Sequence, residues 1–127
     1  MVSVDSLDLE RVDLIKLDVE GHELAVLRGG RAMLARDLPI LLVELEERFG
    51  AGSIARVHAF MESFGYRGLF LDHRHLYPIA MFDPRRFQKM EQWSQVGAYI
   101  NNFIFITERD YPSIRARLAG IGYPAPP

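Results

Sequence analysis

The sequence contains no cysteine among its 127 residues, so it has no disulfide framework and no thiolate ligand for a metal ion. It also lacks an apolar run of the roughly 20 residues that a membrane-spanning helix requires. Its first residues include Asp5, Asp8 and Glu10, where a secretory signal would have basic residues followed by an apolar stretch. We therefore expect a cytoplasmic protein that has no membrane partner.

Positive charge is not in excess, because 15 lysine and arginine residues stand against 17 aspartate and glutamate residues, for a net charge of −2. A domain that binds nucleic acid needs a clear excess of basic residues, so we expect no nucleic-acid partner. The length of 127 residues and the apolar share of 49% suffice for one small domain with a buried core. We therefore treat residues 1–127 as a single domain.

The first half of the chain alternates between strand and helix patterns. Residues 12–17 and 39–45 have the composition of strands, and the second contains an unbroken apolar run typical of a strand buried on both faces of a parallel sheet. Between them a helical pattern is interrupted by the glycine pair at 29–30, and a short helix over 31–36 follows. A strand, a helical segment and a strand within about 30 residues form a βαβ unit, which predicts two parallel strands.

The second half contains the clearest helix of the sequence. Ser53 is suited to cap its N-terminus, one face is apolar from Ile54 to Phe64, and Gly65 is suited to end it. Beyond it we expect a strand over residues 66–71, a long irregular loop over 72–98, a last strand over 99–107 and a short helix over 113–118. A loop of this length inside a compact domain is typical of a functional or a disordered segment.

Four short stretches resemble one protein family when they are taken in order. They are residues 4–7, 13–23, 26–29 and 43–44. The hallmark is a lysine, a hydrophobic residue, Asp-Val-Glu-Gly, any residue and Glu, here at 16–23, where it would close a strand and open a helix. In this pattern the chain resembles the FkbM-type S-adenosylmethionine-dependent methyltransferases.

The resemblance implies an α/β fold: the C-terminal half of a Rossmann-like (class I) methyltransferase, with a mostly parallel sheet and an antiparallel last strand. Methyltransferases of this class place a glycine-rich cofactor loop after their first strand and an acidic residue after their second, and both would precede residue 1. No Gly-x-Gly-x-x-Gly occurs in the sequence. We therefore expect residues 1–127 to be a partial domain that lacks the N-terminal cofactor-binding strands and is inactive alone.

The same resemblance implies S-adenosylmethionine as cofactor and methyl transfer to a hydroxyl of a small molecule or sugar. Ligands of open α/β sheets bind beyond the carboxyl ends of the strands, where Asp18 and Glu20 would lie. Transfer to oxygen requires a group that takes the hydroxyl proton, and Asp18, Glu20 and His22 are the catalytic candidates. Asp18 and Gly21 are the candidates for contact with the cofactor. In a competing interpretation, Asp18 caps the following helix while Glu20 and Glu23 favour its dipole.

The strand over residues 39–45 leads into a second group of carboxylates. Glu44 and Glu46 would lie beside the first group, and we assign them to binding of the acceptor. A non-catalytic role stays open as the alternative. Without its neighbour the strand over 12–17 would have an unpaired edge, and a second copy of the chain would cover it. That alternative predicts a dimerising scaffold or interaction module derived from a methyltransferase.

Residues 72–98 contain two further patterns. His73 and His75 stand at i and i+2, a spacing that permits metal ligation, but the sequence offers no clear third ligand and we predict no metal site. Basic and aromatic residues also occur together here. They predict either a patch for a sugar, a phosphate or a partner, or a loop that packs its rings against the sheet. These residues are Phe82, Arg85, Arg86, Phe87, Lys89 and Trp93.

Overall fold

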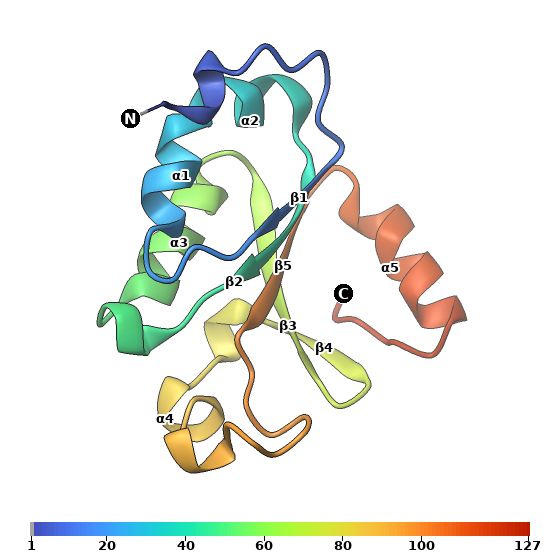
Figure 1. The fold of residues 1–127 in the computed structure, drawn as a ribbon. Helices are drawn as coiled ribbons and strands as arrows, with labels where there is room; N and C mark the ends of the chain where they lie inside the picture. The colour runs from blue at the N-terminus through green and yellow to red at the C-terminus, as the bar shows by residue number, and fades with distance from the viewer. Residues whose placement is uncertain (1) are drawn as a thin grey trace.

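The computed structural model describes residues 2–127, which form one five-stranded sheet flanked by helices (Figure 1). The strands are β1 (Leu14–Leu17), β2 (Ile40–Glu44), β3 (Tyr66–Asp72), β4 (His75–Pro78) and β5 (Asn102–Thr107), in the spatial order β1-β2-β5-β3-β4. The helices are α1 (Glu23–Gly29), α2 (Arg31–Asp37), α3 (Ser53–Glu62), α4 (Pro84–Phe87) and α5 (Tyr111–Gly120). Short 3-10 helices cover Val4–Ser6, Glu47–Phe49, Ile79–Met81 and Met90–Gln92. Residues 2–127 contain no helix that could span a bilayer.

The strand directions depart in part from the expectation. β1 and β2 pair in parallel, as the βαβ pattern predicts, and β5 is antiparallel to both of its neighbours, as expected of the last strand. The expectation of a mostly parallel sheet is wrong, because only one of the four strand pairings is parallel. β1, β2 and β3 do run in one direction. Their parallel ladder is broken because β5 inserts between β2 and β3, and β4 returns from β3 as a hairpin.

Residues 72–98 are more regular than the predicted irregular loop. Asp72 pairs with His75 across a two-residue hairpin turn, in which His73 adopts a left-handed conformation with a φ of 55°. The chain then forms β4, two 3-10 helices and α4. The sequence does not reveal these elements because each spans only three or four residues, which is too short to establish a hydrophobic period.

The aromatic side chains of this segment mostly pack inward. The ring of Phe82 lies 4.8 Å from that of Phe103 in β5 and 5.3 Å from that of Phe87, between ring centres, and Phe87 is buried. Two of the three aromatic residues of the predicted surface patch therefore belong to the core. This is the arrangement in which the loop packs its rings against the sheet, and Trp93 alone of the three stays exposed.

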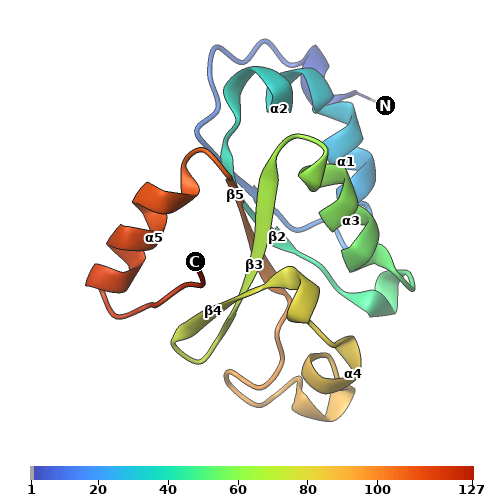
Figure 2. The same ribbon diagram turned by 180° about the vertical axis from the view of Figure 1, so that it is seen from behind.

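The sheet separates two cores of unequal size. The larger lies on the face covered by α1, α2 and α3, and it includes Leu34, Val57 and Phe105, which are almost inaccessible to solvent. The smaller lies on the opposite face under α5 and includes Ile106 and Tyr111. Figure 2 shows α5 standing apart from the other helices, with the sheet between them. Both faces of the sheet are thus covered by packed side chains, and the ends of its strands place the candidate functional side chains.

The start of α3 is capped by a carboxylate rather than by a hydroxyl. The prediction that Ser53 is the cap is wrong, because Gly52 occupies the cap position with a φ of 76°. The carboxylate of Glu47 accepts hydrogen bonds from the amide of the cap residue Gly52 and from the amide of Ile54 in the first turn. The hydroxyl of Ser53 donates instead to the carbonyl of Glu46, at 3.2 Å.

Candidate functional site

The turn that follows β1 is fixed by close packing against the loop that follows β2. Glu20 and Gly21 both have positive φ values, of 48° and 95°, so the chain reverses sharply here. A Cβ atom on Gly21 would lie 2.8 Å from the Cβ of Phe49, which leaves room for glycine alone. The buried Glu23 accepts a 3.0 Å hydrogen bond from the Gly21 amide. The glycine and the second glutamate of the sequence pattern therefore hold the turn.

The three predicted catalytic residues, Asp18, Glu20 and His22, are all exposed on this turn. His22 occupies the cap position of α1, but no side chain forms a capping hydrogen bond with that helix. The interpretation that Asp18 caps α1 is therefore wrong. The charge of Asp18 acts instead on Glu44, at the end of the neighbouring strand.

Glu44 lies at the end of β2, where its carboxylate is half-buried and held from two sides. The side-chain amide of Asn101 donates a 2.6 Å hydrogen bond to Oε1, and the Nζ of Lys16 lies 3.6 Å from Oε2. Burial raises the pKa of Glu44, the negative charge of Asp18 raises it further, and Lys16 opposes the shift. The ends of β1 and β2 thus bring Asp18 and Glu44 together, as expected from their parallel pairing.

Glu46, predicted to bind the acceptor, is buried and fully engaged within the protein. Its Oε2 lies 2.8 Å from the Nε of Arg48 and accepts a 2.5 Å hydrogen bond from the Tyr99 hydroxyl. Its Oε1 accepts a second bond from Arg48, of 3.1 Å. Burial, together with the hydrogen bond to Glu46, raises the pKa of Tyr99 to about 12. Glu46 therefore anchors Arg48 and Tyr99 rather than facing a ligand directly.

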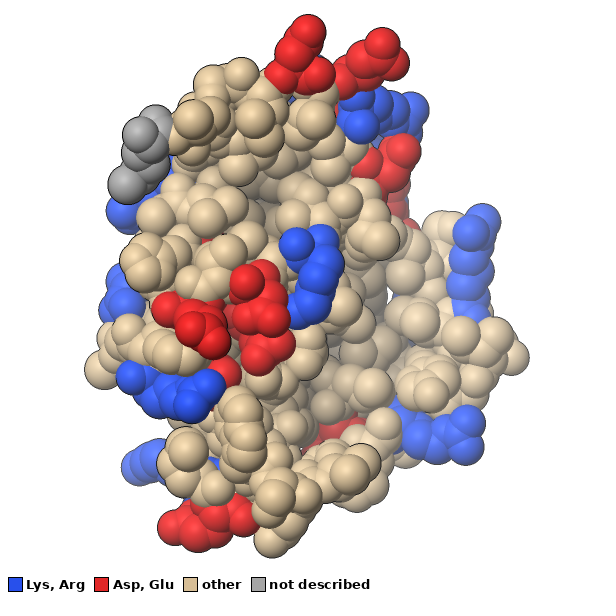
Figure 3. All heavy atoms as spheres, in the orientation of Figure 1, with Lys and Arg blue, Asp and Glu red and all other residues tan. Residues whose placement is uncertain are grey.

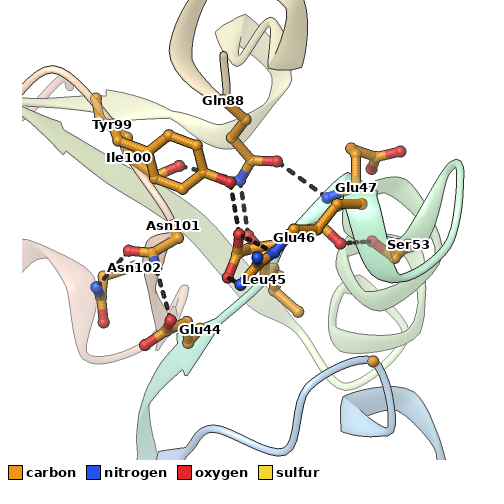
Figure 4. Close-up of polar contacts among 12 residues, drawn as sticks. Glu44, Leu45, Glu46, Glu47, Ser53, Gln88, Tyr99, Ile100, Asn101 and Asn102 are labelled. Carbon is orange, nitrogen blue, oxygen red and sulfur yellow. Dashed lines mark hydrogen bonds and ion pairs between the residues drawn. The ribbon is translucent and has the colours of Figure 1, made fainter. Parts of the chain in front are cut away.

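Gln88 ties the end of β2 to the segment that leads into β5 (Figure 4). Its side-chain amide donates to the carbonyls of Leu45 and Ile100, at 2.7 and 3.0 Å, and its oxygen accepts from the amide of Glu47, at 3.0 Å. Gln88, Tyr99 and Asn101 were not expected from the sequence. No short pattern marks them, because they reach β2 only through the tertiary fold.

A glycine-rich stretch precedes α3, but its geometry does not suit an anionic ligand. Residues 50–55 read Gly-Ala-Gly-Ser-Ile-Ala and follow a strand, which is the context of a phosphate-binding turn. The carboxylate of Glu47 already accepts hydrogen bonds from the amides of Gly52 and Ile54. A negatively charged group would be repelled from the same amides by Glu47, so this turn is a structural helix start.

Acidic side chains gather over the ends of β1 and β2, with basic side chains on either side (Figure 3). Carboxylates in this arrangement attract a cation and can accept a proton. Within residues 2–127 we find no group of three histidine, aspartate or glutamate side chains that could hold a metal ion. At the hairpin turn, the Nδ1 atom of His73 lies 2.8 Å from the Oδ1 atom of its neighbour Asp72.

A family model of the FkbM methyltransferase domain matches residues 2–67. The chain belongs to this family. The matched residues include Asp18 and Glu44, whereas Gln88 and Tyr99 lie beyond them. Membership makes the chain methyltransferase-like and implies the S-adenosylmethionine that methyltransferases use in general. Neither the curated proteins nor the solved structures gave a match to this FkbM chain.

The raised pKa of Glu44 predicts a pH-dependent effect of Glu44→Gln on the stability of the FkbM chain. Above the folded-state pKa the wild type carries an unfavourable charge that glutamine removes, so we expect the variant to have the higher free energy of unfolding at pH 7. The gain should shrink as the pH falls and vanish below the ordinary value of 4.5, where both states of the wild type are protonated.

Urea denaturation at pH 7 and pH 4 measures this difference. Glu10→Gln, at an exposed glutamate of the N-terminal segment, is the matched control and should change stability equally little at both pH values. A Glu44→Gln variant that is less stable than the wild type at pH 7 would contradict the assigned shift.

Proposed function

We propose that the chain contributes the acceptor end of an S-adenosylmethionine-dependent O-methyltransferase site, in which Glu44 takes the proton of the acceptor hydroxyl. The observation that carries the proposal is the convergence of Asp18 and Glu44 at the carboxyl ends of two parallel strands in an FkbM chain. Ligands of open α/β sheets bind at such ends. The common direction of β1, β2 and β3 supports the C-terminal half of a Rossmann-like sheet.

Methyl transfer to oxygen forms a bond between that oxygen and the methyl carbon, breaks the carbon–sulfur bond of the donor and releases the hydroxyl proton. When bound, S-adenosylmethionine supplies the electrophilic methyl group on a positively charged sulfur. Glu44 is suited to take the proton, because a carboxylate with a raised pKa is a stronger base than a solvated one. Asn101 orients it through the 2.6 Å hydrogen bond. The negative charge of Asp18 favours a cationic group nearby.

The other predicted residues take different parts in the proposal. Glu20 and His22 stay catalytic candidates on the exposed turn, and Gly21 stays a candidate for approach to the cofactor. Glu46 becomes a positioning residue, because its carboxylate is bound by Arg48 and Tyr99. The acceptor is a hydroxyl of a small molecule or sugar.

The residues of the chain fit one part of the cofactor only. The acidic strand ends suit the positive sulfur, but residues 1–127 contain no Gly-x-Gly-x-x-Gly loop to receive the rest of the molecule. The glycine turn before α3 is occupied by the Glu47 carboxylate. The proposal therefore includes that this chain alone binds S-adenosylmethionine too weakly for activity.

Isothermal titration with S-adenosylmethionine tests the proposal on two proteins: this chain, and a version extended at its N-terminus through the upstream coding sequence. We expect no detectable heat from the chain alone at millimolar cofactor and micromolar binding by the extended version. Micromolar binding by the chain alone would contradict the expected inactivity. No binding by either protein would contradict the methyltransferase proposal itself.

A second candidate function is a dimerising scaffold, and the open edge of β1 favours it. The carbonyl of Asp13 accepts a hydrogen bond from the amide of Ile40 in β2. Because successive residues of a strand alternate in direction, the backbone N–H and C=O groups of Leu14 and Lys16 point away from β2, towards the open edge of the sheet. Leu14 is 66% exposed, and a cavity of about 300 Å³ lies beside it, lined by apolar residues such as Val12. An unpaired apolar edge of this kind is a site for strand addition by a second copy.

Light scattering across the micromolar range tests the scaffold. A dimer is expected for the wild type and a monomer for Leu14→Lys, because the substitution replaces the exposed apolar side chain of the edge strand by an unpaired charge. Leu7→Lys is the matched control, since Leu7 is 50% exposed but lies outside β1, and it should leave the dimer intact. A monomeric wild type would contradict the scaffold.

A further inference from the structure

A cavity of about 260 Å³ opens beside Tyr99, and none of the roles proposed above uses it. It is lined by Trp93, Ser94, Gln95, Val96, Gly97, Tyr99 and Asn101. Asn101 also donates the 2.6 Å hydrogen bond to Glu44. One side chain therefore links the cavity to the carboxylate to which we assign the acceptor proton.

Trp93 is a partly exposed aromatic residue whose ring contacts two side chains that are themselves fixed. Its ring lies 5.0 Å from the ring of Tyr99 in an edge-to-face contact, and the guanidinium of Arg48 lies 4.6 Å from its centre. Tyr99 and Arg48 are in turn both bound by the buried Glu46. Trp93 as a residue is nevertheless 49% exposed. A large aromatic face that is fixed before binding loses little entropy when a flat ligand stacks on it.

The polar groups around the cavity are neutral. Ser94 and Gln95 offer a hydroxyl and an amide. The amide of Asn101 is instead bonded to Glu44 and Asn102. No lysine, arginine, aspartate or glutamate lines the cavity. The charge of the nearby Arg48 is matched by Glu46 at 2.8 Å. A phosphate or a carboxylate would therefore find no unmatched cation here, whereas a neutral ligand with several hydroxyls finds both donors and acceptors.

We propose that this cavity binds a neutral, hydroxylated six-membered ring, such as a pyranose or a cyclitol, with one C–H face stacked on Trp93 and its hydroxyls directed to Ser94 and Gln95. An aromatic wall with a few convergent polar groups is the usual composition of a small-molecule site. This inference rests on the proposed function and makes the cavity its acceptor subsite, connected to Glu44 through Asn101.

Trp93 is the single tryptophan of the chain, so its fluorescence reports on this cavity directly. We would titrate the chain, without cofactor, with methyl α-D-glucopyranoside, myo-inositol and glucose 6-phosphate. We expect a saturable change in emission with a neutral ring at a millimolar dissociation constant, and no tighter binding of the phosphate. Saturation-transfer NMR on the same samples detects binding independently of emission. No saturable signal by either method up to about 100 mM would overturn the proposal.

Variants assign the signal to the cavity. Trp93→Ala and Gln95→Ala should each weaken binding about tenfold by NMR, the cost of a lost stacking or hydrogen-bond contact. Met90→Ala is the matched control, because Met90 is exposed on the same segment but does not line the cavity, and it should bind as the wild type does. Equal binding by Trp93→Ala and wild type would overturn the stacking role.

The outcome is separable from that of the cofactor titration. Saturable ring binding by the chain supports the subsite even where the extended protein fails to bind S-adenosylmethionine, in which case the methyltransferase proposal alone is lost. Cofactor binding by the extended protein with no ring binding by the chain overturns the subsite and leaves the methyltransferase proposal standing.

Discussion

Replacing Gly21 by alanine is expected to lower the free energy of unfolding by about 3 kcal/mol, the sum of a backbone cost and a packing cost. The backbone cost arises because the φ of Gly21 is 95°, a conformation that alanine adopts with strain. The packing cost arises because the new Cβ would lie 2.8 Å from the Cβ of Phe49. Relief of this clash must move the turn after β1 away from the loop after β2, which separates the two groups of carboxylates.

Gly65→Ala separates the backbone cost from the packing cost. Urea denaturation measures the free energy of unfolding of this variant and of Gly21→Ala. Gly65 has a similar φ of 78°, but apart from its two chain neighbours no residue has an atom within 4 Å of the position that a Cβ would take there. A loss of only about 1 kcal/mol is therefore expected, from the backbone alone. Equal losses of the free energy of unfolding in the two variants would show that the Phe49 side chain moves aside at no cost. The close packing of the two loops would then not be what fixes the site.

Replacing Glu46 by alanine is expected to cost about 3 kcal/mol, because it leaves Arg48 and Tyr99 without their common partner. The Glu46 side chain is only 3% exposed, whereas that of Arg48 is 39% exposed and can turn towards water, which keeps the cost near the low end for a broken buried pair. The fluorescence of Trp93 should shift to longer wavelength in this variant, because Arg48 and Tyr99 hold the indole.

Asp13→Ala is the matched control for Glu46→Ala. Asp13 also forms an ion pair with an arginine at 2.8 Å, but both side chains of that pair are 76% exposed. Its loss should cost less than about 1 kcal/mol and leave the emission of Trp93 unchanged. Similar costs for the two variants, or an unshifted emission in Glu46→Ala, would contradict the anchoring role of Glu46.

The elements with a strong hydrophobic pattern were predictable from the sequence. The apolar run of β2 and the break between α1 and α2 at Gly30 follow from local rules, and the structure has both. β4 was missed because four residues carry no period, and the insertion of β5 between β2 and β3 is a choice of topology that local propensity does not determine. The prediction of a mostly parallel sheet is wrong for the same reason, because it depends on where β5 inserts.

The candidate site was predictable to the same extent. Asp18 and Glu44 could be placed together because parallel neighbouring strands end at the same edge. The sequence could not distinguish Glu44 from Glu46, because burial and partners decide which carboxylate is engaged, and both depend on residues far along the chain. Gln88 lies in the segment that we predicted to be irregular, and Tyr99 begins the predicted last strand. Nothing in either pattern indicates that their side chains contact the end of β2, so only the folded chain reveals it.

The central claim is that the carboxylates at the ends of β1 and β2 form one end of a methyltransferase site, and the cofactor titration tests it most directly when variants are included. S-adenosylmethionine should bind the N-terminally extended protein at micromolar concentration and bind its Asp18→Asn variant about tenfold more weakly, because the charge that favours the cation is lost. Asp13→Asn, at an exposed position just before the same strand, should bind as the wild type does. Equal affinity of the Asp18→Asn variant and the wild type would contradict the claim.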